Sequence, residues 1–133
     1  MKTSCGWKGK AAAFGFAVTV LAGCASVETG PPKEEVVKNR AQTRWNALVL
    51  GDVKTAYEFY GPGTRATLSL AEFTTGLRQG FWKAVTVDKV ECPAADRCEV
   101  STTIEYEHRG MRIKSPSRET WIREGSDWWL VRR

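Results

Sequence analysis

The stretch that decides the fold is residues 100–114, Val-Ser-Thr-Thr-Ile-Glu-Tyr-Glu-His-Arg-Gly-Met-Arg-Ile-Lys. Apolar and polar side chains alternate from Val100 to Glu107, which is typical of a strand with one buried face and one solvated face. The dipeptide Arg109-Gly110 then permits a two-residue hairpin turn. These residues therefore predict a β-hairpin.

The predicted turn fixes a register that suits both faces of the hairpin. The opposed pairs are Glu107 with Arg112, Glu105 with Lys114, and Tyr106 with Ile113. We interpret the charged residues as cross-strand pairs on a solvated face. His108 is then an exposed turn residue, with no Cys or Ser placed beside it for a nucleophilic triad.

Helices are predicted before the hairpin and further strands on either side of it. Residues 34–50 place Val37, Ala41, Trp45 and Leu48 on one stripe of a helix, with Lys38, Arg40 and Arg44 beside the stripe. Gly51 closes this helix, and Asp52 is the N-cap of a shorter one that Gly61-Pro62-Gly63 ends.

A third helix is predicted from a capping box, and two more strands complete the domain. Ser69-Leu70-Ala71-Glu72 has the capping-box pattern and leads into Phe73 and Leu77. Strands are predicted at residues 83–92 and 127–132. The fold class is therefore α+β, with three N-terminal helices followed by an antiparallel four-stranded meander.

Length and composition limit the chain to one folded unit. The 133 residues are 42% hydrophobic and 26% charged, which suits a single domain with one core and excludes a disordered chain. Residues 34–133 are the predicted domain. A polar segment, residues 24–33, precedes it as a tether.

The amino terminus has the pattern of an export signal. Lys2, Lys8 and Lys10 precede the apolar run Ala11–Leu21, whose 11 residues fall well short of the roughly 20 that span a bilayer. Leu21-Ala22-Gly23-Cys24 resembles a bacterial lipobox, which implies cleavage after residue 23 and lipid on Cys24. An ordinary signal peptide with an accidental cysteine is the alternative.

Removal of residues 1–23 would also remove most of the net positive charge. It lowers the count of basic residues from 20 to 17 against 15 acidic ones. No nucleic-acid-binding module is visible in the remainder, so we expect no nucleic-acid partner. Gly-rich phosphate loops and zinc signatures are also missing from the sequence, and no cofactor is expected.

The number and spacing of the cysteines are consistent with export. Cys92 and Cys98 flank a short loop between two predicted strands, and an even pair in an oxidising compartment predicts a disulfide. A metal site is the alternative. Two cysteines with one distant histidine make a poor ligand set, so we expect no metal.

Motifs distributed along residues 34–133 resemble a known family. They are Arg44-Trp45-Asn46-Ala47-Leu48, Gly51-Asp52, Ala56-Tyr57, Pro62, Arg65, Phe73, Val90-Glu91-Cys92, Cys98-Glu99-Val100, Glu119-Thr120-Trp121, Gly125 and Trp128-Trp129. In this order they resemble small bacterial lipoproteins of the nuclear transport factor 2-like superfamily. The resemblance implies a cone in which a curved antiparallel sheet wraps the first helix around an interior pocket. That superfamily contains isomerases and cyclases as well as noncatalytic modules.

The hairpin register identifies candidate pocket residues. Extended along both strands, it places Val100 opposite Glu119 and Thr102 opposite Ser117, provided that Pro116 does not break it. A polar patch on the inner face would then comprise Asp88, Thr102, Ser115, Ser117 and Glu119, with Trp45 and Tyr57 in the pocket wall. Asp88 and Glu119 are the candidate catalytic carboxylates of an isomerase or cyclase. The same register leaves Val85 and Val87 on the outside, where they would suit a homodimer or an envelope protein partner.

The sequence favours a binding module over an enzyme. We expect a lipoprotein anchored through Cys24 to the outer membrane and facing the periplasm, because Ala25 replaces the Asp that retains many lipoproteins in the inner membrane. Its expected role is noncatalytic binding or assembly, with a small apolar ligand or a protein partner. The alternative is a small-molecule enzyme that uses Asp88 and Glu119.

Overall fold

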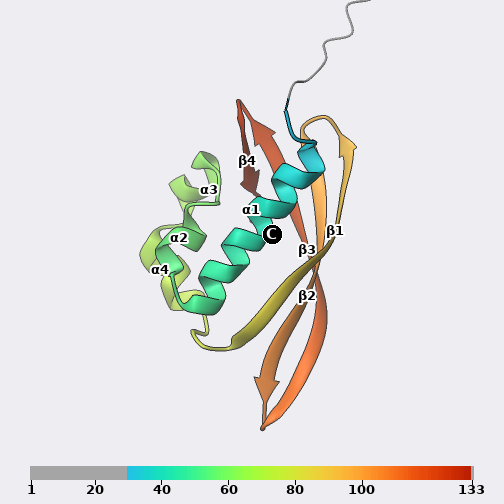
Figure 1. The fold of residues 1–133 in the computed structure, drawn as a ribbon. Coiled ribbons are helices and arrows are strands. Elements are labelled where there is room, and N and C mark those ends of the chain that lie inside the picture. Colours follow the sequence, from blue (N-terminus) through green and yellow to red (C-terminus); the bar gives the residue numbers. More distant parts are fainter. Residues whose placement is uncertain (1–29, 133) are drawn as a thin grey trace, which may run out of the picture.

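A long helix lies across one face of a four-stranded antiparallel sheet, with three short helices beside it (Figure 1). The computed structural model describes residues 30–132. The helices are α1 (Lys33–Leu50), α2 (Val53–Tyr57), α3 (Pro62–Thr67) and α4 (Leu70–Gly76). The strands are β1 (Trp82–Ala94), β2 (Arg97–His108), β3 (Met111–Glu124) and β4 (Asp127–Leu130), paired in that order. The predicted α+β class with an antiparallel four-stranded meander is confirmed.

Three helix boundaries follow the sequence signals. Gly51 ends α1 in the left-handed conformation, with φ of 78°, which a residue without Cβ adopts at no steric cost. The Asp52 carboxylate accepts a hydrogen bond from the Thr55 amide and caps α2. Ser69 and Glu72 form the predicted capping box at the start of α4.

The prediction of three helices is wrong, because the described residues form four. The Gly61-Pro62-Gly63 sequence predicted only the end of a helix. Pro62 instead occupies the first turn of α3, where its missing N–H would have no partner in any helix. The helix before it ends at Tyr57, three residues earlier than Tyr60.

The register of the β2–β3 hairpin is confirmed. Pairing runs without a break from His108 opposite Met111 to Arg97 opposite Ile122. Pro116 lies opposite Thr103 and causes no slip. It lies in a part of β3 that has only one neighbouring strand, because β4 pairs only with residues 121–124, and proline is tolerated at such an edge.

The predicted orientation of β1 is wrong at Val85, Val87 and Asp88. The register between β1 and β2 shifts between Val87 and Lys89, which is a β-bulge. Because one extra residue reverses the alternation of side chains, Val85 and Val87 are buried, 8% and 4% exposed, whereas Asp88 is exposed. The outward valines that suggested a dimer therefore belong to the core.

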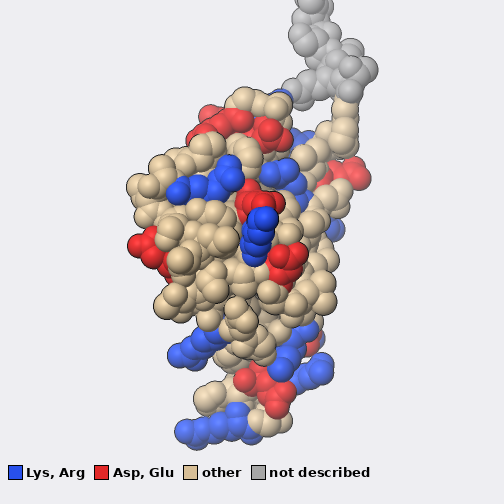
Figure 2. All heavy atoms as spheres, turned by 90° about the vertical axis from the view of Figure 1, so that its left-hand side faces the viewer, with Lys and Arg blue, Asp and Glu red and all other residues tan. Residues whose placement is uncertain are grey.

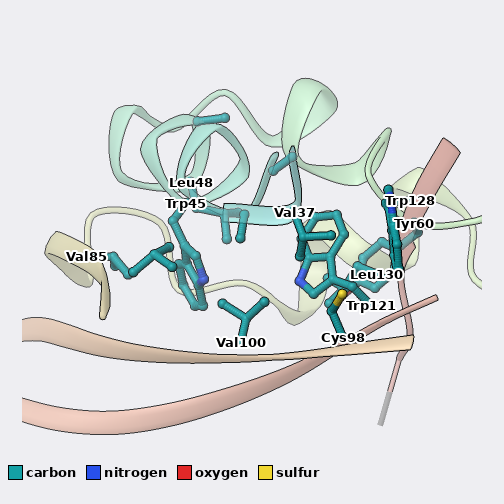
Figure 3. Close-up of a cluster of buried hydrophobic side chains, with 14 of the residues drawn as sticks. Val37, Trp45, Leu48, Tyr60, Val85, Cys98, Val100, Trp121, Trp128 and Leu130 are labelled. Atoms are coloured by element: carbon teal, nitrogen blue, oxygen red, sulfur yellow. The ribbon is translucent and has the colours of Figure 1, made fainter. Parts of the chain in front are cut away.

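The core lies between α1 and the sheet (Figure 3). Val37, Trp45 and Leu48 descend from α1 toward Val100 and Trp121 of the sheet. At the far edge, the Leu130 amide donates to the Phe59 carbonyl and attaches β4 to the chain before α3. Among residues 30–132, no helix is long and apolar enough to cross a membrane.

The β2–β3 hairpin projects beyond the helices. Figure 2 shows the side that carries the short helices, where positive and negative side chains are intermixed, and several Lys and Arg side chains lie at the lower end beside acidic ones. Arg109, Arg112 and Lys114 belong to this end and are exposed. Both turn residues, Arg109 and Gly110, have positive φ, of 51° and 74°, as a two-residue hairpin turn requires.

Candidate functional site

A buried ion pair joins α1 to the sheet. Arg44 Nη1 donates to Glu119 Oε1 over 2.7 Å, and the two side chains are only 6% and 8% exposed. Glu119 is on β3 and faces inward, as the register predicted. A pair removed from water in this way is costly to separate, because either partner alone would be an uncompensated buried charge.

Tryptophan side chains surround the same carboxylate. Trp121 Nε1 donates to Glu119 Oε2 over 3.2 Å, so both carboxylate oxygens are engaged. Figure 3 shows the indole nitrogens of Trp45 and Trp121 pointing toward each other across the core. Trp45 Nε1 is buried and has no hydrogen-bond partner of ordinary geometry among the described residues.

The guanidinium of Arg44 is enclosed by aromatic rings. Its carbon lies 5.0 Å from the centre of the Trp45 ring and 5.6 Å from that of Tyr60, within the range of cation–π attraction. Its Nε is buried and also has no acceptor among residues 30–132. The charge of Arg44 is therefore stabilised by one carboxylate and two ring faces.

Burial controls the acidity of Glu119. Removal from water raises the pKa of this carboxyl, and the Arg44 charge and the neighbouring indole N–H groups lower it by less. Among the described acids whose pKa clearly departs from its ordinary value, Asp52, Glu72 and Glu91 shift downward, each through hydrogen bonds at the surface. The pKa of Glu119 moves in the opposite direction because only at Glu119 is desolvation the largest of the effects on the pKa.

A cavity of about 320 Å³ opens beside this ion pair. Arg44 and Trp45 of α1, Tyr60, and Ser117 and Glu119 of β3 line it, together with the residues that follow β4 up to Arg132. Arg44 and Glu119 are the charged side chains that face inward, whereas Arg132 is exposed and Arg118 alternates with Ser117 and Glu119 to the outer face. We take this cavity, with the Arg44–Glu119 pair, as the candidate site.

Three of the sequence-predicted site residues meet here. Trp45, Ser117 and Glu119 all line the cavity. Thr102 is on the same inner face, opposite Ser117, but only 1% exposed, and its hydroxyl lies 3.5 Å from the Ser117 carbonyl. Ser115 continues the same row of inward residues on β3 and is half-buried.

Asp88 and Tyr57 lie elsewhere. The Asp88 carboxylate is on the outer face, where it accepts a hydrogen bond from the Thr103 hydroxyl over 2.8 Å. The expectation that Asp88 and Glu119 share the inner face is therefore wrong, and the bulge is the reason. Tyr57 donates to the Leu68 carbonyl over 2.6 Å and packs against Phe73, so it holds the short helices together.

Arg44 and Arg132 were not predicted to line the cavity. Arg44 was placed beside the apolar stripe, whereas it lies within it, three residues after Ala41 and four before Leu48. That spacing could have revealed a buried arginine, because both positions are one helical turn away. Arg132 approaches Tyr60 only through the folding of β4 alongside residues 59–60, which no local pattern indicates.

The predicted disulfide is confirmed. Cys92 and Cys98 are bonded across the turn that joins β1 to β2. Cys98 is fully buried, so the bond joins the hairpin to the core. Within residues 30–132, no group of three His, Cys, Asp or Glu side chains is arranged to hold a metal ion. Cys24 and the predicted signal segment, residues 1–23, lie outside the described residues.

The chain is similar to known proteins in fold but not in sequence. No family model matches the chain, and no curated protein matches its sequence. A SEC-C motif containing protein from Psychrobacter arcticus is similar in structure, with a TM-score of 0.60 and 14% identity over 72% of this chain and 58% of its own. The likeness establishes the fold alone. This chain spans less than two thirds of that neighbour.

A second solved structure gives the same result. It is a SEC-C motif containing protein from Rhodopseudomonas palustris, with a TM-score of 0.57 and 14% identity over 70% of this chain and 73% of its own. The resemblance to nuclear transport factor 2-like lipoproteins is therefore wrong as a family assignment. The sequence motifs that suggested it are short, and each alone is weak.

Proposed function

We propose that this protein is a lipid-anchored, noncatalytic binding module of the bacterial envelope, attached through Cys24 to the outer membrane and facing the periplasm. The disulfide between Cys92 and Cys98 supports export, because such bonds persist in oxidising compartments. The sequence Leu21-Ala22-Gly23-Cys24 supports lipidation. Its ligand site is the cavity beside Arg44 and Glu119.

The Arg44–Glu119 ion pair carries the noncatalytic part of the proposal. Both oxygens of Glu119 are occupied by donors from this chain, and the second carboxylate of the isomerase hypothesis, Asp88, faces the opposite side of the sheet. A general acid–base mechanism with two carboxylates would need both in one cavity. A cavity with a fixed internal ion pair instead suits recognition of a ligand.

Lipidation is tested by labelling the full chain with an alkyne analogue of palmitate in its bacterial host. Wild type should be labelled, lose residues 1–23 and sediment with the outer membrane. The Cys24→Ser variant should be unlabelled and uncleaved. Cys5→Ser is the matched control, because that cysteine lies in the predicted signal segment and its loss should change nothing. Equal labelling of Cys24→Ser and wild type would contradict the proposal.

The binding role is tested on the same purified lipoprotein by native mass spectrometry. A noncovalent small molecule, released on denaturation, is the expected finding. A protein that carries its covalent lipid and nothing else, even after incubation with an extract of envelope metabolites, would contradict the binding role while leaving the anchor intact.

A further inference from the structure

The cavity beside Arg44 contains more hydrogen-bond donors than acceptors. Its one inward carboxylate, Glu119, already accepts from Arg44 and from Trp121. Arg44 Nε is buried and is left with no acceptor in the described part of the chain. A buried donor without a partner costs about 1–3 kcal/mol, so the unbound site is incomplete on the acceptor side.

The net charge of the cavity also favours a ligand that supplies hydrogen-bond acceptors. Arg44 and Arg132 contribute two positive charges to the cavity, and Glu119 contributes one negative charge. Arg132 is exposed and forms no ion pair within the described residues, although its charge helps to lower the pKa of Glu72. The side chain of Arg132 is therefore free to turn toward a ligand.

The position of the Arg44 guanidinium in the cavity wall is fixed by its surroundings. Arg44 forms part of the wall and is itself more than nine-tenths buried, and its guanidinium is held between the Trp45 and Tyr60 rings. Ser117 adds a hydroxyl on the opposite wall. A guanidinium that is fixed in this way is preorganised to donate hydrogen bonds to a planar or tetrahedral oxyanion.

We propose that the cavity binds the carboxylate or phosphate group of a small molecule, between the buried Arg44 and the exposed Arg132. This inference rests on the proposed binding function and deepens it. It replaces the expected small apolar ligand with an anionic one. Carboxylate and phosphate share the chemistry that Arg44 recognises, and separate probes distinguish them.

The first experiment compares matched probes on the full-length lipoprotein in detergent at fixed ionic strength. Succinate tests a carboxylate and glycerol phosphate tests a phosphate. Butane-1,4-diol and 1,4-diaminobutane have the same carbon chain as succinate, but are neutral and cationic. Isothermal titration calorimetry gives the affinity, and the NMR signal of the Trp45 indole N–H, assigned with Trp45→Phe, reports the location.

At least one of the two anions should bind and shift the Trp45 signal, whereas the diol and the diamine should bind at least tenfold more weakly. The stronger anion identifies the source of the oxyanion. Equal affinity for the diol and the anions would overturn the inference in favour of an uncharged ligand. Preference for the diamine would overturn it as well.

Variants of the two cavity cations connect binding to the geometry. Arg132→Gln should weaken anion binding roughly tenfold, because it removes a charge-assisted contact at an exposed position where folding is not at risk. Arg109→Gln is the control, since it removes an equal charge at the distant hairpin turn and should leave affinity unchanged. Equal loss in both variants would indicate a nonspecific charge effect and would overturn the site.

Glu119→Gln should change the affinity for anions in the opposite direction to Arg132→Gln. It removes the internal anion that competes for Arg44, so succinate or glycerol phosphate should bind more tightly, by roughly tenfold. Weaker anion binding in a folded Glu119→Gln variant would contradict the proposal. If no anion binds but native mass spectrometry finds another ligand, this inference fails and the binding role stands.

Discussion

The buried carboxyl of Glu119 makes the stability of the protein depend on pH. Burial raises the pKa of this carboxyl in the folded protein, from the ordinary value of 4.5. A carboxyl whose pKa is higher in the folded chain than in the unfolded chain takes up a proton on folding between the two values. Its contribution to stability is therefore complete below the unfolded pKa and is lost as pH rises through the folded pKa.

The free energy of unfolding of wild type, relative to Glu119→Gln, should therefore decrease as pH rises above about 4.5. The surface carboxyls Asp52, Glu72 and Glu91, whose pKa values are lowered, act in the opposite direction, but they are common to both proteins. Urea unfolding at a series of pH values measures the difference. A difference that stays flat or increases with pH would show that Glu119 is not desolvated.

At this scale, the sequence predicted which β3 residues face inward but not the partner of Glu119. Alternation from the hairpin turn placed Ser117 and Glu119 correctly, because pairing in β2–β3 has no break. Arg44 was not recognised as buried, since an arginine beside an apolar stripe is ordinarily solvated. Its burial depends on Tyr60, Trp45 and Glu119 meeting from three separate segments.

Among the elements, β1 depends on α1 for protection of its free edge. The Gln42 side chain donates to the Val85 carbonyl over 2.9 Å and accepts from the Val87 amide over 3.0 Å. One amide group thus occupies the positions that a neighbouring strand would fill. An open edge strand invites pairing with another chain, so this contact stabilises the fold and also blocks association.

Gln42→Ala should destabilise the protein by about 1–3 kcal/mol, because it leaves two backbone groups of β1 without partners. The Val87 amide should also exchange its hydrogen faster. Thr43→Ala is the control, since Thr43 is the next residue on α1 and bonds only to Asn39 of its own helix. Chemical denaturation and hydrogen exchange measure the effects, and equal losses in the two variants would refute the edge contact.

Some elements were predictable from the sequence because their signals are local. The capping box of α4 and the turn at Arg109-Gly110 involve neighbouring residues, and both were predicted correctly. The start of α3 at Pro62 was missed because proline marks both the end of one helix and the start of another. The bulge after Val87 left no sequence signal, and it reversed the faces of β1.

For the whole molecule, the two faces of the sheet have different roles. One face packs against α1 and contains the core, and the other carries charged and hydroxyl side chains such as those of Glu99, Thr103 and Lys114. Neighbouring residues on β1 test this assignment, because Thr86 is exposed and Val87 is buried.

Val87→Glu should destabilise the protein by at least about 3 kcal/mol, since it places an unpaired carboxylate in the core. Thr86→Glu, which adds the same charge one residue away, should change stability by less than about 0.5 kcal/mol. Thermal unfolding followed by circular dichroism distinguishes them. A Val87→Glu variant that stays fully folded while its sedimentation mass falls would restore the outward orientation and the dimer.

The β2–β3 hairpin gives the molecule a long axis with unlike ends. Lys33 at the start of α1 bonds to the Ala94 carbonyl near the disulfide, whereas the Arg109-Gly110 turn lies at the other end (Figure 1). Twelve residues of β2 extend roughly 40 Å between them. If Cys24 carries the lipid, as proposed, the anchor joins the domain at the end that holds the disulfide, and the Arg109-Gly110 turn lies about 40 Å from that point of attachment.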